Sequence, residues 1–164
     1  MKKIFLASLV AVFGFANQIT AQSSITATLI HEDEIKTFYG KSALREAHSA
    51  AVHGDIITLS SGRFTSANIS KAVAVRGAGM EYDSLSATEP TIIAGNFEIR
   101  ISNDSTLQNN VFSMEAIYHD DQISVCDGVQ NPQFIKCKFG TITTKSSNYA
   151  GLINAQFIHC IISN

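Results

Sequence analysis

The sequence contains little charge. Only 16% of its 164 residues are charged, 45% are hydrophobic, and the net charge is −2. This composition provides a core for one domain and excludes an intrinsically disordered chain, which carries more charge and fewer apolar residues. It also lacks the excess of basic residues with which proteins bind nucleic acids and anionic membrane surfaces. We therefore predict a single globular domain with no nucleic-acid partner.

Long hydrophobic runs are absent after the first residues, which excludes a membrane-spanning helix of about 20 apolar residues in that part of the chain. The N-terminus differs, because Lys2 and Lys3 precede the uncharged run Ile4–Ala16, and a small residue follows at a cleavage position. This run is too short to span a bilayer and has the features of a bacterial Sec signal peptide. We predict a signal peptide over 1–22 and an exported domain over 23–164, without a transmembrane anchor. Its location would be the periplasm, the outer surface or the extracellular space.

Cysteine is scarce, and its three residues show neither CxxC nor zinc-site spacing. Cys126, Cys137 and Cys160 are also an odd number for an exported protein. Cys137 and Cys160 occupy matching positions of two sequence repeats, so a disulfide between them is within reach if the repeats stack. A ladder of buried thiols is the alternative, and it is the arrangement that we expect.

One segment, Ser42–His53, has the pattern of an amphipathic helix. Ser42 is a suitable N-cap, Leu44 and Ala47 lie on one face, and Gly54 supplies the left-handed residue that ends the helix. A helix of about 12 residues is not stable alone in water. We therefore expect it to dock on the strands that follow.

After this helix the sequence consists of short apolar segments separated by turns rich in Gly, Ser and Asn. Phe134–Phe139 (FIKCKF) and Phe157–Ile162 (FIHCII) match at a spacing of 23 residues, and Leu107–Phe112 is a weaker copy 27 residues before the first. This spacing favours a parallel solenoid over an antiparallel sandwich, because equivalent residues of a solenoid stack about 4.8 Å apart. The first phenylalanines of the two matching segments would then stack, as would their cysteines.

The N-terminal half has a more specific pattern. A helix is followed by Gly-Asp, an apolar strand, Ser-Gly-x-Phe, Ile-x-Lys, a second strand and Arg-Gly-Ala-Gly. In this chain these features are Ala43–Val52, Gly54-Asp55, Ile56–Leu59, Ser61–Phe64, Ile69–Lys71, Val73–Val75 and Arg76–Gly79.

This order resembles the N-terminal segment of right-handed parallel β-helix proteins of the pectin-lyase-like superfamily, and Thr91–Gly95 is similar to their next strand. The resemblance covers about 37–101, and the rest of the chain only through its repeat spacing. It implies an all-β fold, a right-handed single-stranded parallel β-helix (solenoid). Its N-terminal α-helical cap, Ser42–His53, would cover the open end.

The chain ends at Asn164, directly after a repeat strand. Polysaccharide lyases of the superfamily carry acidic calcium ligands and a catalytic Arg or Lys on later, central coils. None of their catalytic residues can therefore be carried onto a position of this sequence. We expect the N-terminal part of a longer protein, truncated at its C-terminus, with self-association through the open C-terminal edge.

One acidic cluster is Asp120-Asp121, which follows His119 and precedes Asp127. Calcium takes six to eight oxygen ligands on a shaped loop, and two adjacent aspartates more often belong to a solvated loop. We name Asp120 and Asp121 as the candidate calcium ligands of this chain and predict no other cofactor.

Other polar patterns point to structure rather than to chemistry. Gly77–Gly79 lacks the third glycine of a dinucleotide-binding motif and predicts a turn. His48 and His53 are five residues apart, a spacing that does not suit a metal-binding pair on a helix, so both are expected at the surface. Arg76 and Arg100 are expected to be ordinary exposed residues.

Functions of different classes fit this sequence. The first is a secreted bacterial β-helix module that binds a polysaccharide or a cell-surface glycan. The alternative is the N-terminal portion of a polysaccharide lyase or glycoside hydrolase acting on pectin-like or acidic glycans, and a structural adhesin stalk is a third. An enzyme would need an acidic cluster with an Arg or Lys on one face. Because the sequence lacks that cluster, we predict the binding module.

Overall fold

The structure, a computed structural model, describes residues 25–82, 89–101, 111–126, 129–145 and 153–163. The predicted signal peptide over 1–22, most of the weaker repeat and Asp127 lie outside the described residues. Within these ranges the chain forms thirteen strands and one helix. The protein is therefore a mostly-β structure.

The chain begins with an antiparallel hairpin of β1 (Thr26–His31) and β2 (Glu34–Tyr39). His31 pairs with Glu34, which leaves Glu32-Asp33 as the turn, and Glu32 has a positive φ of 51°. The other side of β1 pairs antiparallel with β3 (Ile56–Leu59). The hairpin therefore forms one edge of a sheet.

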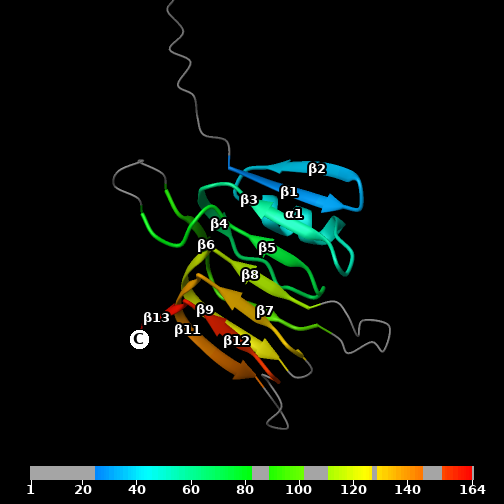
Figure 1. Cartoon of the computed structure of the whole chain (residues 1–164). Coiled ribbons are helices and arrows are strands. Elements are labelled where there is room, and N and C mark those ends of the chain that lie inside the picture. The colour runs from blue at the N-terminus through cyan, green and yellow to red at the C-terminus, as the bar shows by residue number, and fades with distance from the viewer. Residues whose placement is uncertain (1–24, 83–88, 102–110, 127–128, 146–152, 164) are drawn as a thin grey trace, which may run out of the picture.

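From β3 onward the strands build two open sheets, and every pairing among them is parallel (Figure 1). The seven-stranded sheet has the order β12-β10-β8-β5-β3-β1-β2, and the six-stranded sheet has the order β13-β11-β9-β6-β4 with β7 paired to β9. Most chain passages give one strand to each sheet in turn. The remaining strands are β4 (Gly62–Thr65), β5 (Ala74–Arg76), β6 (Thr91–Ala94), β7 (Phe97–Ile99), β8 (Ser113–Glu115), β9 (Tyr118–Cys126), β10 (Gln133–Ile135), β11 (Lys138–Lys145), β12 (Gln156–Ile158) and β13 (Ile161–Ile162).

The predicted fold class, a right-handed single-stranded parallel β-helix with an N-terminal α-helical cap, is wrong. The described chain forms two mostly parallel sheets that are not closed. The antiparallel hairpin, not the helix, occupies the N-terminal edge of the larger sheet. Repeat spacing sets which strands are parallel neighbours, but it does not set how many sheets form or whether they close, and the prediction went wrong at that step.

The core lies between the two sheets and is built from alternate residues of the strands. Phe134 is fully buried on β10, next to the edge strand β12. Its ring stacks on Phe157 at 5.0 Å between centroids and 9° between planes, and it meets Phe139 edge-on at 5.4 Å. The stack predicted from the two matching repeats is thus confirmed, because β10 and β12 pair in the register that places Phe134 beside Phe157.

Sharp two-residue turns lead the chain from one sheet to the other. Ala116, Lys136 and His159 occupy the same place in three successive turns, with φ of 56°, 50° and 53°. Left-handed backbone costs a residue with a Cβ roughly 1 kcal/mol, so the stacked turns must be held by their hydrogen bonds. The N–H of Ala116 donates to Ile135 O, and that of Lys136 donates to Ile158 O, at 3.0 and 2.8 Å.

The helix α1 (Ala43–Ala50) is shorter than the predicted span and packs on the first strands. Ser42 is the N-cap residue, but its side chain makes no capping hydrogen bond. The C-terminus of α1 is instead held by Lys71, whose Nζ donates to the carbonyl oxygens of His48, Ser49 and Ala51 at 2.8, 2.9 and 2.6 Å. A lysine at this position also interacts favourably with the helix dipole.

His48 was expected at the surface, and this prediction is wrong. Its side chain is buried, and Nε2 accepts a hydrogen bond from Ser70 N at 3.2 Å. Burial lowers the pKa of His48 to about 4. The neighbouring His53 is half-buried and accepts a hydrogen bond from Ala72 N at 3.0 Å. Both histidines therefore attach the helix to the segment before β5.

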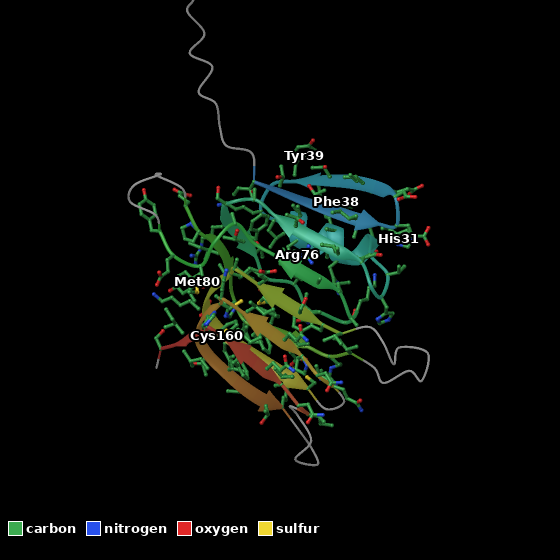
Figure 2. All side chains as sticks on the ribbon, viewed as in Figure 1. His31, Phe38, Tyr39, Arg76, Met80 and Cys160 are labelled. Carbon is green, nitrogen blue, oxygen red and sulfur yellow. The ribbon has the colours of Figure 1, made fainter. Side chains whose placement is uncertain are left out.

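The two ends of the sheets differ in their surfaces. Figure 2 shows His31, Phe38 and Tyr39 at the hairpin end and Cys160 at the opposite end. Near Cys160, β12 and β13 are edge strands, and their apolar side chains are well exposed, including Phe157 at 41% and Ile162 at 56%. Within the described ranges no helix has the length and apolar character needed to cross a membrane.

Candidate functional site: a polar groove on strands β7 and β9

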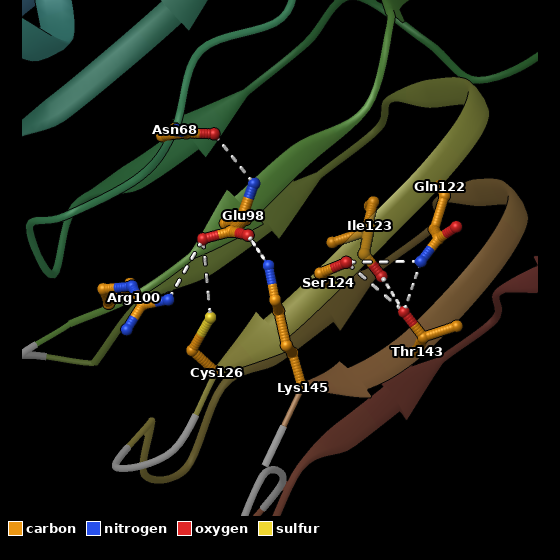
Figure 3. A network of polar contacts seen from close by, with 9 residues as sticks. All are labelled: Asn68, Glu98, Arg100, Gln122, Ile123, Ser124, Cys126, Thr143 and Lys145. Carbon is orange, nitrogen blue, oxygen red and sulfur yellow. Dashed lines mark hydrogen bonds and ion pairs between the residues drawn. The ribbon is translucent and has the colours of Figure 1, made fainter. Parts of the chain in front are cut away.

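An open groove of about 350 Å³ lies on the outer side of the six-stranded sheet. We call it the polar groove. Its lining residues come from β7, β9 and the segments that precede β7, and Figure 3 shows most of them together with the neighbouring strand β11. They are Asn68, Asn96, Phe97, Glu98, Gln122 and Ser124.

The alternation of the strands explains why polar side chains gather here. In β9, Ile123 and Val125 are fully buried, so the residues between and before them face outward. In β7, Phe97 and Ile99 are buried in the same way, and Glu98 faces outward. The parallel register then places Glu98 beside Ser124.

Strand β11 extends the same outer face. Ser124 pairs with Thr143, and Cys126 pairs with Lys145. Polar side chains on β7, β9 and β11 therefore form rows that cross the strands at the spacing of the sheet, which is about 4.8 Å.

Two asparagines line the groove in fixed orientations. Asn68 Oδ1 accepts a hydrogen bond from Glu98 N, and Asn96 Oδ1 accepts one from Gln122 N, both at 3.0 Å. A backbone N–H can only donate, so each carboxamide oxygen must face the backbone. This assignment leaves both Nδ2 groups as donors on the other side of the carboxamide.

Gln122 supplies a hydrogen-bond acceptor. Its Nε2 donates to Thr143 Oγ1 at 2.8 Å and to Ser124 Oγ at 3.3 Å (Figure 3). Both amide hydrogens then have partners, and Oε1 is left to accept hydrogen bonds. The polar groove thus combines amide donors on the segments before β5 and β7 with an amide acceptor on β9.

Glu98 is the charged residue of the lining, and it lies between two cations (Figure 3). Oε1 pairs with Lys145 Nζ at 2.5 Å, and Oε2 pairs with Arg100 Nη2 at 3.2 Å. The hydrogen bonds from Lys145 and Arg100 lower the pKa of Glu98, and the same contact raises the pKa of Lys145. Glu98 therefore stays ionised at neutral and mildly acidic pH.

Cys126 lies beneath this ion cluster. Its Sγ is 3.8 Å from Glu98 Oε2, and only 2% of the residue is exposed. Burial raises the pKa of the Cys126 thiol. A buried, protonated thiol is a poor nucleophile, so this cysteine has the character of a packing residue.

The other two cysteines are free thiols as well. Cys137 Sγ donates to Met114 O at 3.3 Å, and Cys160 Sγ donates to Phe134 O at 3.2 Å. Burial raises the pKa of Cys137 to about 12. The ladder of buried thiols expected from the sequence is observed only in part, because Cys137 is buried and Cys160 is half-buried.

The predicted calcium ligands Asp120 and Asp121 lie in β9, outside the groove. The register of β9 and β11 shifts here, so both aspartates face Gly140 in a β-bulge. A Cβ at Gly140 would lie 3.0 Å from Asp121 O and 3.1 Å from Asp120 O, which explains the glycine.

Each of these aspartates already has a protein partner. Asp120 Oδ2 pairs with Arg63 Nη2 at 2.6 Å, and Asp121 Oδ2 accepts a hydrogen bond from Gly95 N at 3.0 Å. In the part of the chain that the structure describes, no group of three or more metal-ligating side chains occurs. Calcium at Asp120 and Asp121 stays a prediction.

His119, predicted as part of the same cluster, points the other way. It is fully buried, Nε2 is 3.0 Å from Gly95 O, and its ring meets Phe97 edge-on at 5.0 Å. Burial lowers the pKa of His119. The neutral ring therefore serves the core and not the surface cluster.

The remaining sequence predictions have mixed outcomes. Gly77–Gly79 forms a turn in which Ala78 N donates to Thr91 Oγ1 at 2.7 Å, and a Cβ at Gly77 would lie 2.4 Å from Ala116 O. Arg76 lies 3.8 Å from Glu115 on the seven-stranded sheet. Arg100 is exposed, as expected, and its guanidinium also pairs with Glu98.

Sequence reasoning missed the groove residues altogether. The signal was present in the alternation of polar and apolar residues in Asn96-Phe97-Glu98-Ile99-Arg100 and Gln122-Ile123-Ser124-Val125. That pattern identifies outward positions, but not which outward positions of distant strands become neighbours.

Comparison with known proteins identifies no relative. No protein-family model matches this chain, and no curated protein or solved structure resembles it closely enough to count as a match. The resemblance to the pectin-lyase-like superfamily therefore stays a prediction. The polar groove is therefore the feature from which we infer a function.

Proposed function

We propose that this protein is an exported module that binds a glycan in the polar groove. The observation that carries the proposal is the set of oriented amides that line the groove, on β9 and on the segments that precede β5 and β7. A sugar hydroxyl both donates and accepts hydrogen bonds, and it is best matched by neighbouring groups of both kinds. The amide donors of Asn68 and Asn96, next to the Oε1 acceptor of Gln122, supply such a match.

The groove is also of a suitable size and stiffness. Ligand pockets range over roughly 300–1,000 Å³, and at about 350 Å³ this one holds one or two sugar units. Its side chains stand on paired strands, and backbone or side-chain hydrogen bonds fix their orientation. Little conformational entropy is then lost on binding, which favours affinity.

Export and the nature of the partner belong to the same proposal. The Sec-type N-terminus predicted over 1–22 would place the domain where polysaccharides and cell-surface glycans are accessible.

Self-association through the apolar edge of β12 and β13 is a further part of the proposal. Sedimentation velocity tests that part, since Ile162→Lys should lower the sedimentation coefficient if the edge pairs.

Calorimetric titration of the purified chain tests the groove directly. The probes are neutral hexasaccharides of glucose, mannose, xylose and galactose, together with hexagalacturonate. Gln122→Ala should weaken binding about tenfold, which corresponds to roughly 1.4 kcal/mol. Gln133→Ala is the matched control, because Gln133 faces outward from β10 in the other sheet. Equal losses in both variants, or binding of no probe, would contradict the proposal, and cleavage of a probe would support an enzyme instead.

A further inference from the structure

We propose that the polar groove selects neutral glycans over acidic ones, and that Glu98 is the residue that determines this specificity. The inference rests on the proposed function of the groove. It concerns the class of glycan, which the hydrogen-bonding match alone does not decide.

The cations beside the groove are the first part of the argument. Arg100 and Lys145 are two strong anion-binding groups on the same outer face as the groove lining. Left uncompensated, they would attract the carboxylate or sulfate of an acidic sugar. The groove would then be expected to prefer an acidic ligand.

Glu98 changes that expectation. Its two carboxylate oxygens each meet one cation, at 2.5 Å for Lys145 and 3.2 Å for Arg100. Because Glu98 itself lines the groove, an anion bound there would lie against its carboxylate. An acidic sugar would have to displace Glu98 or accept its repulsion, and discrimination by repulsion is a common source of specificity.

The rest of the lining is uncharged. Asn68, Asn96, Gln122 and Ser124 offer amide and hydroxyl groups, which pair well with hydroxyls. None of them carries the full charge that would repay the desolvation of a carboxylate. The low pKa of Glu98 keeps its negative charge in place over the neutral and mildly acidic range.

The experiment compares two classes of probe on one variant. Wild type should bind at least one of the neutral hexasaccharides about tenfold or more tightly than hexagalacturonate in calorimetric titration. Glu98→Gln keeps the shape and removes the charge. It should shift the ratio of the two affinities about tenfold toward hexagalacturonate.

Two further variants keep the result interpretable. Glu115→Gln is the matched control, because Glu115 lies 3.8 Å from Arg76 on the other sheet and should change neither affinity. Adding Lys145→Gln to Glu98→Gln should return the affinity for hexagalacturonate to near its wild-type value. Thermal melting of each variant checks that it is folded.

Each outcome has a distinct meaning. Wild type that binds hexagalacturonate as tightly as the neutral probes, or a Glu98→Gln variant with an unchanged ratio, would overturn this inference and leave the groove as a glycan site. Binding of no probe by wild type or by any variant would overturn the proposed function, and this inference with it.

Discussion

The two halves of β9 both present polar side chains on the outside of the same sheet, but they use them differently. In the first half, Asp120 pairs with Arg63 of β4, and Asp121 accepts a hydrogen bond from the backbone of Gly95, which follows β6. In the second half, Gln122 and Ser124 are bonded to one another and to a neighbouring strand, and they line an open groove.

This difference shows that the density of charge is a poor guide to the site. The aspartate pair is the acidic cluster singled out from the sequence, yet its carboxylates pair with Arg63 and with Gly95 N. Glu98, a single acid flanked by apolar residues, lies in the groove and meets two cations. Strand register, which joins residues distant in sequence, decides between the two roles.

The largest expected effect tests the first half of β9, where the β-bulge lies. Gly140→Ala should lower the free energy of unfolding by about 1–3 kcal/mol, because its Cβ would press on two backbone oxygens of the bulge. Urea denaturation measures the change. Gly79→Ala is the control, since a Cβ there has no neighbour closer than 3.9 Å and should be tolerated. Equal losses in both variants would contradict the assignment of the bulge.

The next test exchanges the roles of adjacent residues. Asp121→Ala removes the acceptor of Gly95 N and should cost about 1 kcal/mol of stability, with no change in glycan affinity. Gln122→Ala should cost less than about 0.5 kcal/mol of stability and yet weaken the glycan about tenfold. Denaturation and calorimetry on both variants give the four values. The reverse pattern, in which Asp121→Ala loses glycan affinity and Gln122→Ala loses stability, would mean that the binding site lies in the first half of β9.

The pH dependence of stability distinguishes the buried His119 of β9 from Glu98 in the groove. Burial holds the pKa of His119 below its usual 6.5, so the unfolded chain binds the proton first and stability should fall as pH drops below about 6.5. The pKa of Glu98 is held below its usual 4.5, so its contribution persists at higher pH and should be lost only below about 4.5.

Variants assign these two windows. Unfolding free energies measured from about pH 7 to about pH 4 should change less steeply in the upper window for His119→Gln, where His48 continues to contribute, and in the lower window for Glu98→Gln. Glu115→Gln should leave both windows unchanged. An effect of His119→Gln in the lower window alone, or of Glu98→Gln in the upper window alone, would contradict this assignment.

The smallest expected effect concerns the support of the groove. Thr143→Ala removes the 2.8 Å hydrogen bond that holds Gln122. Gln122 would keep its contact with the ligand but lose its fixed orientation, so affinity should fall only about two- to fourfold. A loss as large as that of Gln122→Ala would mean that Thr143 itself contacts the glycan.

Local pattern accounts for what could be predicted from the sequence. Apolar runs located the strands at Ile56–Leu59 and Thr91–Ala94, which the structure contains with the same bounds. The matching repeats placed Phe134 against Phe157. Each of these features depends on neighbours in sequence or on one repeat spacing.

What could not be predicted depends on long-range pairing. His48 is buried because Ser70 and Lys71, more than twenty residues away, close over the end of the helix. The arrangement of the strands in two open sheets depends on how β1 pairs with both β2 and β3. The groove likewise requires β7, β9 and β11 to be in register, and one sequence alone does not show that register.

The most direct test of the account is a nuclear magnetic resonance titration that follows the side-chain amides. On addition of the tightest-binding neutral hexasaccharide, the account predicts that the shifts of Asn68, Asn96 and Gln122 side-chain NH₂ groups change in proportion to saturation. The backbone amides of Asp120 and Asp121 should change much less. Shift changes confined to the bulge, to the hairpin or to the β12–β13 edge would contradict the claim that the groove on β7 and β9 is the binding site.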